Sequence, residues 1–403
     1  MELSAGHLTY CTNIHAGESW DAHFESLKKN FPLIKAHVSK DMPMGIGLRL
    51  SNIASIDLQD SSKLQEFKLW LQDNSAYVFT MNGFPYGDFH HAVVKDKVHA
   101  PDWCTTERLD YTLRLFDTLS KLLPKGLSGG ISTSPLTYRH WHPSKEQWEK
   151  AMSASTRNIV SVLGELILIK RNKNISMHLD IEPEPDGMLE TGREFIDWYQ
   201  GVFLPMAVED LKVSLNISAE NVIAAAKEHI CLCYDVCHFA IGYEPHRQVI
   251  DELVESGIAV GKIQISAALK ARLPDDVESR NLIATEFSRF NEPTYLHQVV
   301  AKKEDNSVIR YRDLPAALED IQNPEVSEWR AHFHVPVFID EMGLLNSTRA
   351  DIVEVLNIQK SSVFTSHLEV ETYTWEVLPE SLKASIDQSI SRELNWVRGV
   401  LGD

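Results

Sequence analysis

The sequence has few cysteines, no long apolar run and no excess of positive charge. Its 403 residues include only five cysteines, an odd number without paired spacing, so we expect reduced thiols rather than a disulfide framework. The longest apolar run, Ile159–Ile169, carries Glu165 and is too short to span a bilayer, which takes about 20 residues. The N-terminal MELSAGHLTYC has no apolar segment of the signal-peptide kind. These absences predict a cytoplasmic protein without a membrane span.

Positive charge is scarce as well. The chain has 39 Lys and Arg against 57 Asp and Glu, a formal net charge of −18. Non-specific nucleic-acid binding depends on contacts of Lys and Arg with phosphates, so we do not expect nucleic acid as a partner. No P-loop and no HExxH motif is present. With 43% apolar and 24% charged residues, the chain nevertheless has the composition of a globular protein.

Short apolar runs of strand length alternate along the chain with longer amphipathic stretches. The eight runs are Leu8–Thr12, Ile46–Leu50, Tyr77–Met81, Gly129–Ser134, Ile175–Ile181, Ile230–Asp235, Lys262–Ser266 and His367–Tyr373. The helical stretches are Trp20–Phe31, Ser61–Leu71, Thr106–Leu123, Ser144–Leu168, Leu189–Val208, Ala219–His229, Val249–Ser256, Arg349–Ile358 and Pro379–Leu401. Eight strands alternating with helices predict an α/β fold, a (β/α)8 TIM barrel. A doubly wound open sheet is the alternative, but no GxGxxG follows any of the strands.

The chain is longer than a minimal barrel of about 250 residues. The surplus lies mainly between the seventh and eighth strands, where Tyr295–Val300 and Val308–Tyr311 flank KKEDNS as a hairpin would. We therefore expect one TIM-barrel domain over residues 1–403. An insertion at about 267–350, between strands 7 and 8, would cover the barrel mouth, the end at which the parallel strands finish.

Side chains of metal-ligand type follow several predicted strands, where a barrel builds its site. Glu182, Asp235 and Glu371 come at the ends of three of them, and carboxylates with imidazoles suit Mn, Co, Fe or Zn. Each carboxylate alone is as compatible with a helix cap, so their recurrence at successive strand ends carries the prediction. The further candidates for binding substrate or metal are His15, Arg139, His140, His142, Glu184, His238, Gln264, His297, His332, His334, Tyr373 and Trp375.

Two cysteines of the sixth strand, Cys231 and Cys233, share the face of Asp235. They suit a soft metal as ligands, or fill a barrel interior as small apolar residues. The sequence favours the second interpretation.

The order of a strand-end Glu, Asp-x-x-His, a polar seventh-strand residue and a final Glu resembles the xylose isomerase-like barrel superfamily, which includes sugar isomerases, epimerases and endonuclease IV. A closer resemblance is to the EboE family, the metabolite traffic proteins of the ebo gene cluster. It rests on HLTYCTNIHAGESW (7–20), NGFPYG (82–87), LDIEPEP (179–185), YDVCHFA (234–240), KIQIS (262–266), YLHQ (295–298), HFHVPVF (332–338) and HLEVETYTWEVLP (367–379). The resemblance covers the chain from about Leu8 to Trp375.

The resemblance implies a set of metal ligands. Glu182 corresponds to the fifth-strand glutamate, Asp235 and His238 to the DxxH pair, and Glu371 to the final glutamate. Gln264 stands where many relatives have a histidine, which is a departure from the pattern. His332 and His334 lie where endonuclease IV has an Asp-x-His loop and would supply imidazoles instead.

We therefore expect a sugar isomerase- or epimerase-like enzyme with a divalent metal (Mn, Zn, Fe or Co) acting on a sugar, cyclitol or sugar phosphate. The metal would polarise a carbonyl, Glu182 and Glu371 would transfer the proton, and Arg139 would hold a phosphate. The resemblance further implies work alongside other ebo products, among them a prenyltransferase-like membrane protein and a dehydroquinate-synthase-like cyclase. Three alternatives stay open: a non-catalytic carrier of a metabolite, an endonuclease IV-like phosphoesterase, and an iron-dependent oxidase.

Overall fold

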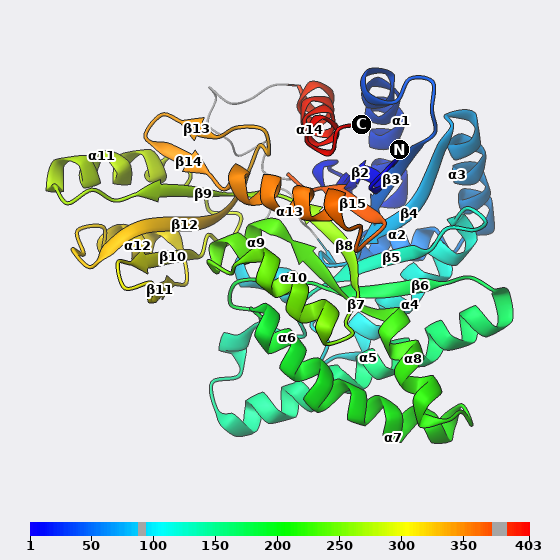
Figure 1. Ribbon diagram of the computed structural model, residues 1–403. Coiled ribbons are helices and arrows are strands. Elements are labelled where there is room, and N and C mark those ends of the chain that lie inside the picture. Colours follow the sequence, from blue (N-terminus) through cyan, green and yellow to red (C-terminus); the bar gives the residue numbers. More distant parts are fainter. Residues whose placement is uncertain (88–93, 373–384) are drawn as a thin grey trace.

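Eight parallel strands form a barrel in the computed structural model, which describes residues 1–87, 94–372 and 385–403 (Figure 1). The strands are β2 (Gly6–Tyr10), β3 (Met44–Arg49), β4 (Ala76–Asn82), β5 (Gly129–Thr133), β6 (Met177–Ile181), β7 (Ile230–Asp235), β8 (Val260–Ile265) and β15 (His367–Val370). Their order is β2-β15-β8-β7-β6-β5-β4-β3, and a short β1 (Glu2–Leu3) pairs antiparallel with β2. A parallel bridge between Cys11 and Gly47 brings the two ends of this sheet together. The predicted TIM barrel is confirmed, with a strand at each of the eight predicted places.

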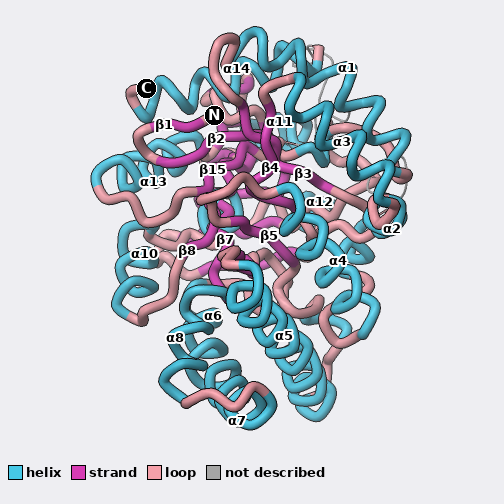
Figure 2. Tube along the Cα trace, turned by 90° about the vertical axis from the view of Figure 1, so that its right-hand side faces the viewer, coloured by secondary structure: helices cyan, strands magenta, loops and turns pink. Residues whose placement is uncertain are grey.

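Helices surround the strands on the outside of the barrel (Figure 2). They are α1 (Trp20–Val38), α2 (Asn52–Asp57), α3 (Ser61–Asp73), α4 (Thr106–Leu122), α5 (Lys145–Lys173), α6 (Gly192–Trp198), α7 (Leu204–Ser214), α8 (Ala219–His229), α9 (Val236–Ile241), α10 (His246–Glu255), α13 (Arg349–Ser361) and α14 (Ile386–Leu401). Single turns lie at Thr12–Ile14, Lys95–His99 and Arg139–Trp141. The helix predicted over 189–208 is present from Gly192 onward, with a π-helical turn at Tyr199–Phe203 that joins α6 to α7. Residues 379–384 of the predicted last helix lie outside the described residues.

Helix α5 is the one described helix that is long and apolar enough to cross a membrane by length and composition. It begins with a capping box in which Ser144 and Gln147 satisfy each other's backbone N–H groups. Half of its most apolar stretch is buried within the protein, and it packs against α4, α7, α8 and β6. Packing on the barrel therefore accounts for its apolar side chains.

A second, antiparallel sheet interrupts the barrel between its seventh and eighth strands (Figure 1). Its elements are β9 (Ala267–Arg272), α11 (Val277–Ser288), β10 (Val299–Lys303), β11 (Val308–Tyr311), α12 (Leu314–Glu319), β12 (Val326–Val335), β13 (Glu341–Met342) and β14 (Leu345–Ser347). Strands β10 and β11 pair as the predicted hairpin, but β10 begins at Val299 rather than Tyr295. Only Ser266 separates β8 from β9, so the second sheet starts directly at the barrel mouth.

The barrel interior is polar, although barrels of this kind are usually filled with branched apolar side chains. Lys262 on β8 and Glu369 on β15 are both fully buried and form an ion pair with 2.6 Å between Nζ and Oε2. The same Nζ donates to Ser132 Oγ at 3.1 Å. A buried pair of this kind strongly opposes loss of either partner, because the remaining charge would be uncompensated. It joins β8 to β15 directly below the mouth.

Helix α14 is joined to the mouth by a buried carboxyl group. Glu393 Oε1 accepts hydrogen bonds from Thr372 Oγ1 at 2.7 Å and from the Val337 N–H at 3.2 Å. Burial raises the pKa of Glu393 from 4.5 to about 8. The folded protein therefore keeps a proton that the unfolded chain loses above about pH 4.5, and this group destabilises the fold increasingly as the pH rises from 4.5 to 8.

We predict that Glu393→Gln makes the protein more stable relative to wild type as the pH rises over this window, by at most about 5 kcal/mol at pH 8. Gln keeps an acceptor oxygen for Thr372 and Val337 and does not ionise. Urea unfolding of both proteins between pH 5 and 8 measures the difference. The exposed Glu255→Gln is the control. A stability difference between the two proteins that does not change with pH would contradict the raised pKa of Glu393.

Candidate active site at the barrel mouth

Three carboxylates meet around a single amide at the ends of the strands. Gln264 on β8 donates Nε2 to Glu182 Oε1 at 3.2 Å and to Asp235 Oδ2 at 3.3 Å, and the same nitrogen bonds Glu371 Oε2. Glu182, Asp235 and Glu371 are each at most 5% exposed. The structure thus brings together three residues that are far apart in sequence. A neutral amide donates hydrogen bonds but carries no charge that would stabilise the ionised forms of these carboxyl groups.

Amide donors also hold the outer oxygen of Glu371. Its Oε1 accepts from Asn13 Nδ2 at 2.8 Å and from Asn82 Nδ2 at 2.7 Å. Glu182 differs, since its Oε2 is buried and has no hydrogen-bond partner among the described residues. The two glutamates therefore lie in unlike environments, one held at both oxygens and one with an oxygen open to a ligand.

Two imidazoles face each other beside the carboxylates. His238 Nδ1 lies 3.0 Å from Pro183 O, and His332 Nδ1 lies 2.9 Å from Oε1 of Gln298, whose own amide nitrogen donates to Pro185 O. These acceptors place a proton on each Nδ1 and leave the Nε2 lone pairs for a ligand. The two Nε2 atoms are 3.2 Å apart. Two lone pairs at this distance repel each other unless a cation lies between or beside them.

The ligand atoms form two overlapping groups. Asp235, His238 and His334 each place one ligand atom within 4.8 Å of the others, and so do Glu184, His238 and His332. The donor types, carboxylate oxygen and imidazole nitrogen, fit Mn, Fe, Co or Zn. The structure therefore unites the His-x-His pair of β12 with the Asp-x-x-His pair that follows β7.

Burial shifts the pKa values of these groups so that their uncharged forms are favoured. Burial, reinforced by Glu371 and Asp235, raises the pKa of Glu182 well above its usual value. Burial and the charge of Asp235 raise the pKa of Glu371 to about 8. Burial lowers the pKa of His332 well below its usual range and that of His334 to about 4. Both sets of shifts show a site that lacks positive charge, and a bound cation would reverse them.

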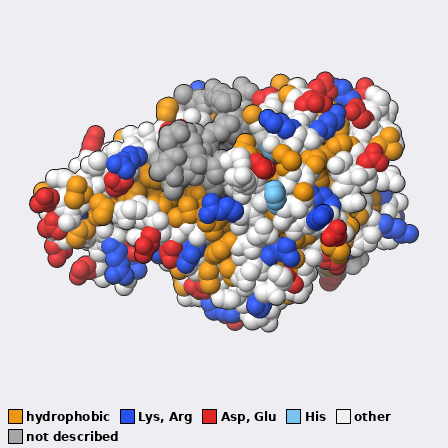
Figure 3. Space-filling view, turned by 90° about the horizontal axis from the view of Figure 1, so that it is seen from above, with side chains coloured by type: hydrophobic (Ala, Val, Ile, Leu, Met, Phe, Trp, Pro, Cys, Tyr) orange, Lys and Arg blue, Asp and Glu red, His pale blue; other side chains and the backbone are white. Residues whose placement is uncertain are grey.

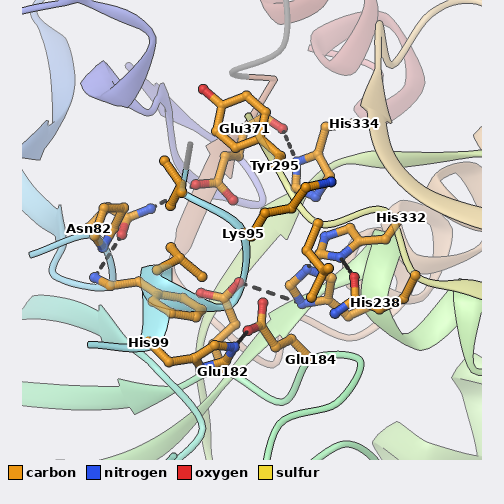
Figure 4. Close-up of a pocket in the computed structure, with 16 residues that line it drawn as sticks. Asn82, Lys95, His99, Glu182, Glu184, His238, Tyr295, His332, His334 and Glu371 are labelled. Atoms are coloured by element: carbon orange, nitrogen blue, oxygen red, sulfur yellow. Dashed lines mark hydrogen bonds and ion pairs between the residues drawn. The ribbon is translucent and has the colours of Figure 1, made fainter. Parts of the chain in front are cut away.

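Glu182, Glu371, His332 and His334 line a pocket at the barrel mouth (Figure 4). The polar lining residues are Asn82, Lys95, His99, Glu182, Glu184, His238, Gln298, His332, His334 and Glu371. The apolar and aromatic ones are Phe84, Pro85, Val94, Val98, Tyr295 and Leu296. The pocket thus combines a carboxylate- and imidazole-rich part with an apolar part.

Three residues that line the pocket or contact its carboxylates are absent from the sequence-based prediction. Asn82 ends β4 and Asn13 follows β2, so strand-end position was the signal that could have found both. His99 comes from the connection between β4 and α4, where its Nε2 lies 2.8 Å from Glu184 Oε1. Nothing in the spacing of the sequence indicates that this connection reaches the pocket.

Five predicted substrate-binding residues are not among the described residues that line the pocket. Arg139 pairs with Glu190 at 3.0 Å and with Glu194 at 3.1 Å. The other four contact neighbouring protein groups: His15 with Tyr10, His140 with Asp186, His142 with Thr137, and His297 with Glu292 and the His332 carbonyl. Tyr373 and Trp375 lie outside the described residues. Of the predicted substrate-binding set, Glu184 lines the pocket.

Comparison with known proteins gives similar folds only. No family model and no curated protein matches the sequence. A zinc-bound IolI protein is 14% identical over 98% of both chains, with a TM-score of 0.47. A magnesium complex of a xylose isomerase-like TIM barrel protein from Mycobacterium smegmatis is 11% identical over 96% of this chain and 90% of its own, with a TM-score of 0.47. The 3-keto-D-glucoside 4-epimerase YcjR from E. coli is 11% identical over 98% of this chain and 99% of its own, with a TM-score of 0.43.

At these identities the likeness concerns the fold and does not extend to activity or ligands. The strand order and the parallel pairing described above define the barrel independently of it.

We predict that Gln264→Met lowers the stability of the chelator-treated protein by at least about 3 kcal/mol. The substitution removes the donor shared by three carboxylates, and a hydrogen bond to a charged group contributes about 1.5–3 kcal/mol. Urea unfolding in the presence of a chelator measures the loss. Gln65→Met, on the exposed side of α3, is the control. Equal stability of the two variants would show that the three carboxylates do not depend on this amide.

Proposed function

We propose that the protein is a divalent-metal-dependent isomerase or epimerase that acts on an uncharged sugar or cyclitol. One observation carries the proposal: three buried carboxylates and the Nε2 atoms of facing imidazoles converge at the barrel mouth, and Glu182, Glu371, His238 and His332 line the pocket there. Asp235, His238 and His334 would hold the metal, with Glu182 and Glu371 beside them. When bound, the metal would polarise a carbonyl or hydroxyl of the substrate and so acidify the neighbouring C–H.

The two glutamates would carry the proton. Glu182 Oε2 is buried and open to a ligand, which suits it to remove a proton from the substrate carbon. Glu371, held by the amides of Asn13, Asn82 and Gln264, would deliver a proton at the acceptor atom of the product. In the reverse reaction the two residues exchange these roles.

Charge at the pocket favours an uncharged substrate over a phosphorylated one. Among the described lining residues Lys95 is the cationic side chain, and it is paired with Asp313 at 2.8 Å. Arg139, the phosphate ligand expected from the sequence, is occupied by Glu190 and Glu194. The face of the molecule in Figure 3 has Lys and Arg interspersed with Asp and Glu rather than gathered together. A phosphate in the pocket would meet carboxylates without a guanidinium or ammonium partner.

We also propose, from the resemblance to the EboE family, that this activity serves a metabolite handled together with other ebo-cluster products in the cytoplasm. The segments that carry the resemblance also supply the pocket. Asn82 belongs to NGFPYG, Glu182 to LDIEPEP, His238 to YDVCHFA and His332 to HFHVPVF, and all four line it. If the members of this family bind a common metabolite, the segments that they have in common should line its binding pocket.

We predict that the protein purified without chelator carries Mn, Fe, Co or Zn at the mouth, and that Asp235→Ala contains one ion fewer per chain. Asp235 is the carboxylate grouped with two imidazoles, so its loss removes a charged ligand. Metal analysis of both proteins measures this. Absence of metal from the wild type, together with no gain in melting temperature on adding these metals, would overturn the proposed function.

We predict further that the metal-loaded protein exchanges a carbon-bound proton of an aldose, ketose or keto-cyclitol with D2O. Glu182→Gln should slow this exchange by at least about 100-fold, because Gln cannot remove the carbon-bound proton. Mass spectrometry over a panel of these compounds measures the exchange, and the exposed Glu146→Gln is the control. Bound metal and a co-purifying metabolite without any exchange would instead support a carrier.

A further inference from the structure

A second cluster of ligand-type side chains lies inside the barrel, below the mouth. It comprises His178 and Asp180 on β6, Cys231 on β7 and His367 on β15. Asp180 is 0% exposed, His367 1%, Cys231 2% and His178 8%. One ligand atom from each of His178, Asp180 and Cys231 lies within 4.8 Å of the others. The proposed reaction at the mouth uses none of these four residues.

Two glycines make room for this cluster. A Cβ on Gly130 would lie 2.6 Å from Asp180 Oδ2 and 2.9 Å from His367 Nδ1. A Cβ on Gly261 would lie 1.8 Å from Asp180 Oδ1 and 2.7 Å from His178 Nδ1. Neither contact is possible for a real side chain. The glycine at 130 leaves a small polar space bounded by a carboxylate oxygen and an imidazole nitrogen.

The two atoms that bound this space are both acceptors. His367 Nε2 lies 3.2 Å from the Ser128 carbonyl, which places the ring proton on Nε2 and leaves Nδ1 as a lone pair. Asp180 Oδ1 is bonded to His178 Nδ1 at 2.6 Å, whereas Oδ2 has no hydrogen-bond partner among the described residues. His367 Nδ1 has none there either. A buried carboxylate oxygen that faces a lone pair is unfavourable unless a positive group lies between them.

We propose that this cluster binds a zinc-like structural metal ion, held by Asp180, Cys231 and His367 with His178 as the fourth side chain. The donors are those of structural zinc sites, namely thiolate, carboxylate and imidazole. A thiolate and a carboxylate together balance a doubly charged ion, so the buried centre would be neutral. The nearby Lys262 keeps its own counter-ion in Glu369. The rings of His178 and His367 are 4.9 Å apart between centroids, close enough to share one ion.

Such an ion would hold β6, β7 and β15 together one layer below the mouth. Each of these strands ends, on the same face, in a residue of the mouth: Asp180 precedes Glu182, Cys231 precedes Asp235, and His367 precedes Glu371. The basal ion would therefore fix the positions of the mouth ligands without contacting the substrate.

Cobalt titration of the full-length, chelator-treated protein tests the site, because a cysteine ligand gives a thiolate-to-cobalt charge-transfer band in the near ultraviolet. We expect two cobalt ions per wild-type chain and this band. Cys231→Ser should bind one ion and lose the band, whereas Asp235→Ala should bind one ion and keep it. Cys104→Ser, which changes a thiol outside the barrel interior, should behave as wild type.

The wild-type spectrum, together with a band that persists in Cys237→Ser, decides the proposal even if Cys231→Ser does not fold, because Cys237 lies beside His332 and His334 at the mouth. Cobalt binding without a thiolate band would overturn it, because the space at Gly130 would then hold a water molecule donating to both acceptors. A band that survives in Cys231→Ser, or that disappears in Cys104→Ser, would overturn it as well. Loss of the ion in Asp235→Ala is independent of these outcomes and concerns the mouth alone.

Discussion

Buried negative charge at the barrel mouth is the constraint around which this molecule is built. Three carboxylates share one neutral amide donor, Gln264. The surrounding groups hold the carboxyl groups in place through hydrogen bonds but contribute no positive charge. Asn13 and Asn82 hold one glutamate, and Ser266 Oγ donates to Asp235 at 2.6 Å. Since amides and hydroxyls carry no charge, the proposed metal cation would supply the positive charge that this arrangement lacks.

The same constraint explains why the second sheet belongs to the site. Ser266, which contacts Asp235, is also the residue that joins β8 to β9. From there the chain returns through β12, whose His332 and His334 face the imidazole of His238. Arg330, two residues before His332, donates to the Ala240 carbonyl and pairs with Asp351 at 3.3 Å. The second sheet is thus attached to the barrel at Ser266 and at Arg330, which fixes His332 and His334 relative to the carboxylates.

Much of the architecture could be predicted from the sequence because it depends on local pattern. The eight strands follow from short apolar runs between amphipathic stretches, and Glu182, Asp235 and Glu371 follow from their position at strand ends. Residues contributed by connections could not be predicted in this way. Tyr295 has the aromatic character of a strand residue, yet it lies in the loop before β10 and lines the pocket. Arg139 follows a strand as expected, but it forms ion pairs with Glu190 and Glu194, which come about 50 positions later in the sequence.

The polar interior of the barrel restricts which residues below the mouth can be substituted without disturbing the site. Usually an apolar core supports the mouth, and mouth residues can change without loss of the fold. Here the layer below the mouth contains the Lys262–Glu369 pair and the Asp180–His178 pair, all of it buried. Each pair resists the loss of either partner, because the remaining charge would lie in a medium of low dielectric constant. Since Asp180 and Glu369 lie two residues before Glu182 and Glu371, the requirements of the interior and those of the mouth fall on the same strands. Stability and chemistry are therefore coupled along β6 and β15, and substitutions in the interior should act on the ligands above them through the backbone of these two strands.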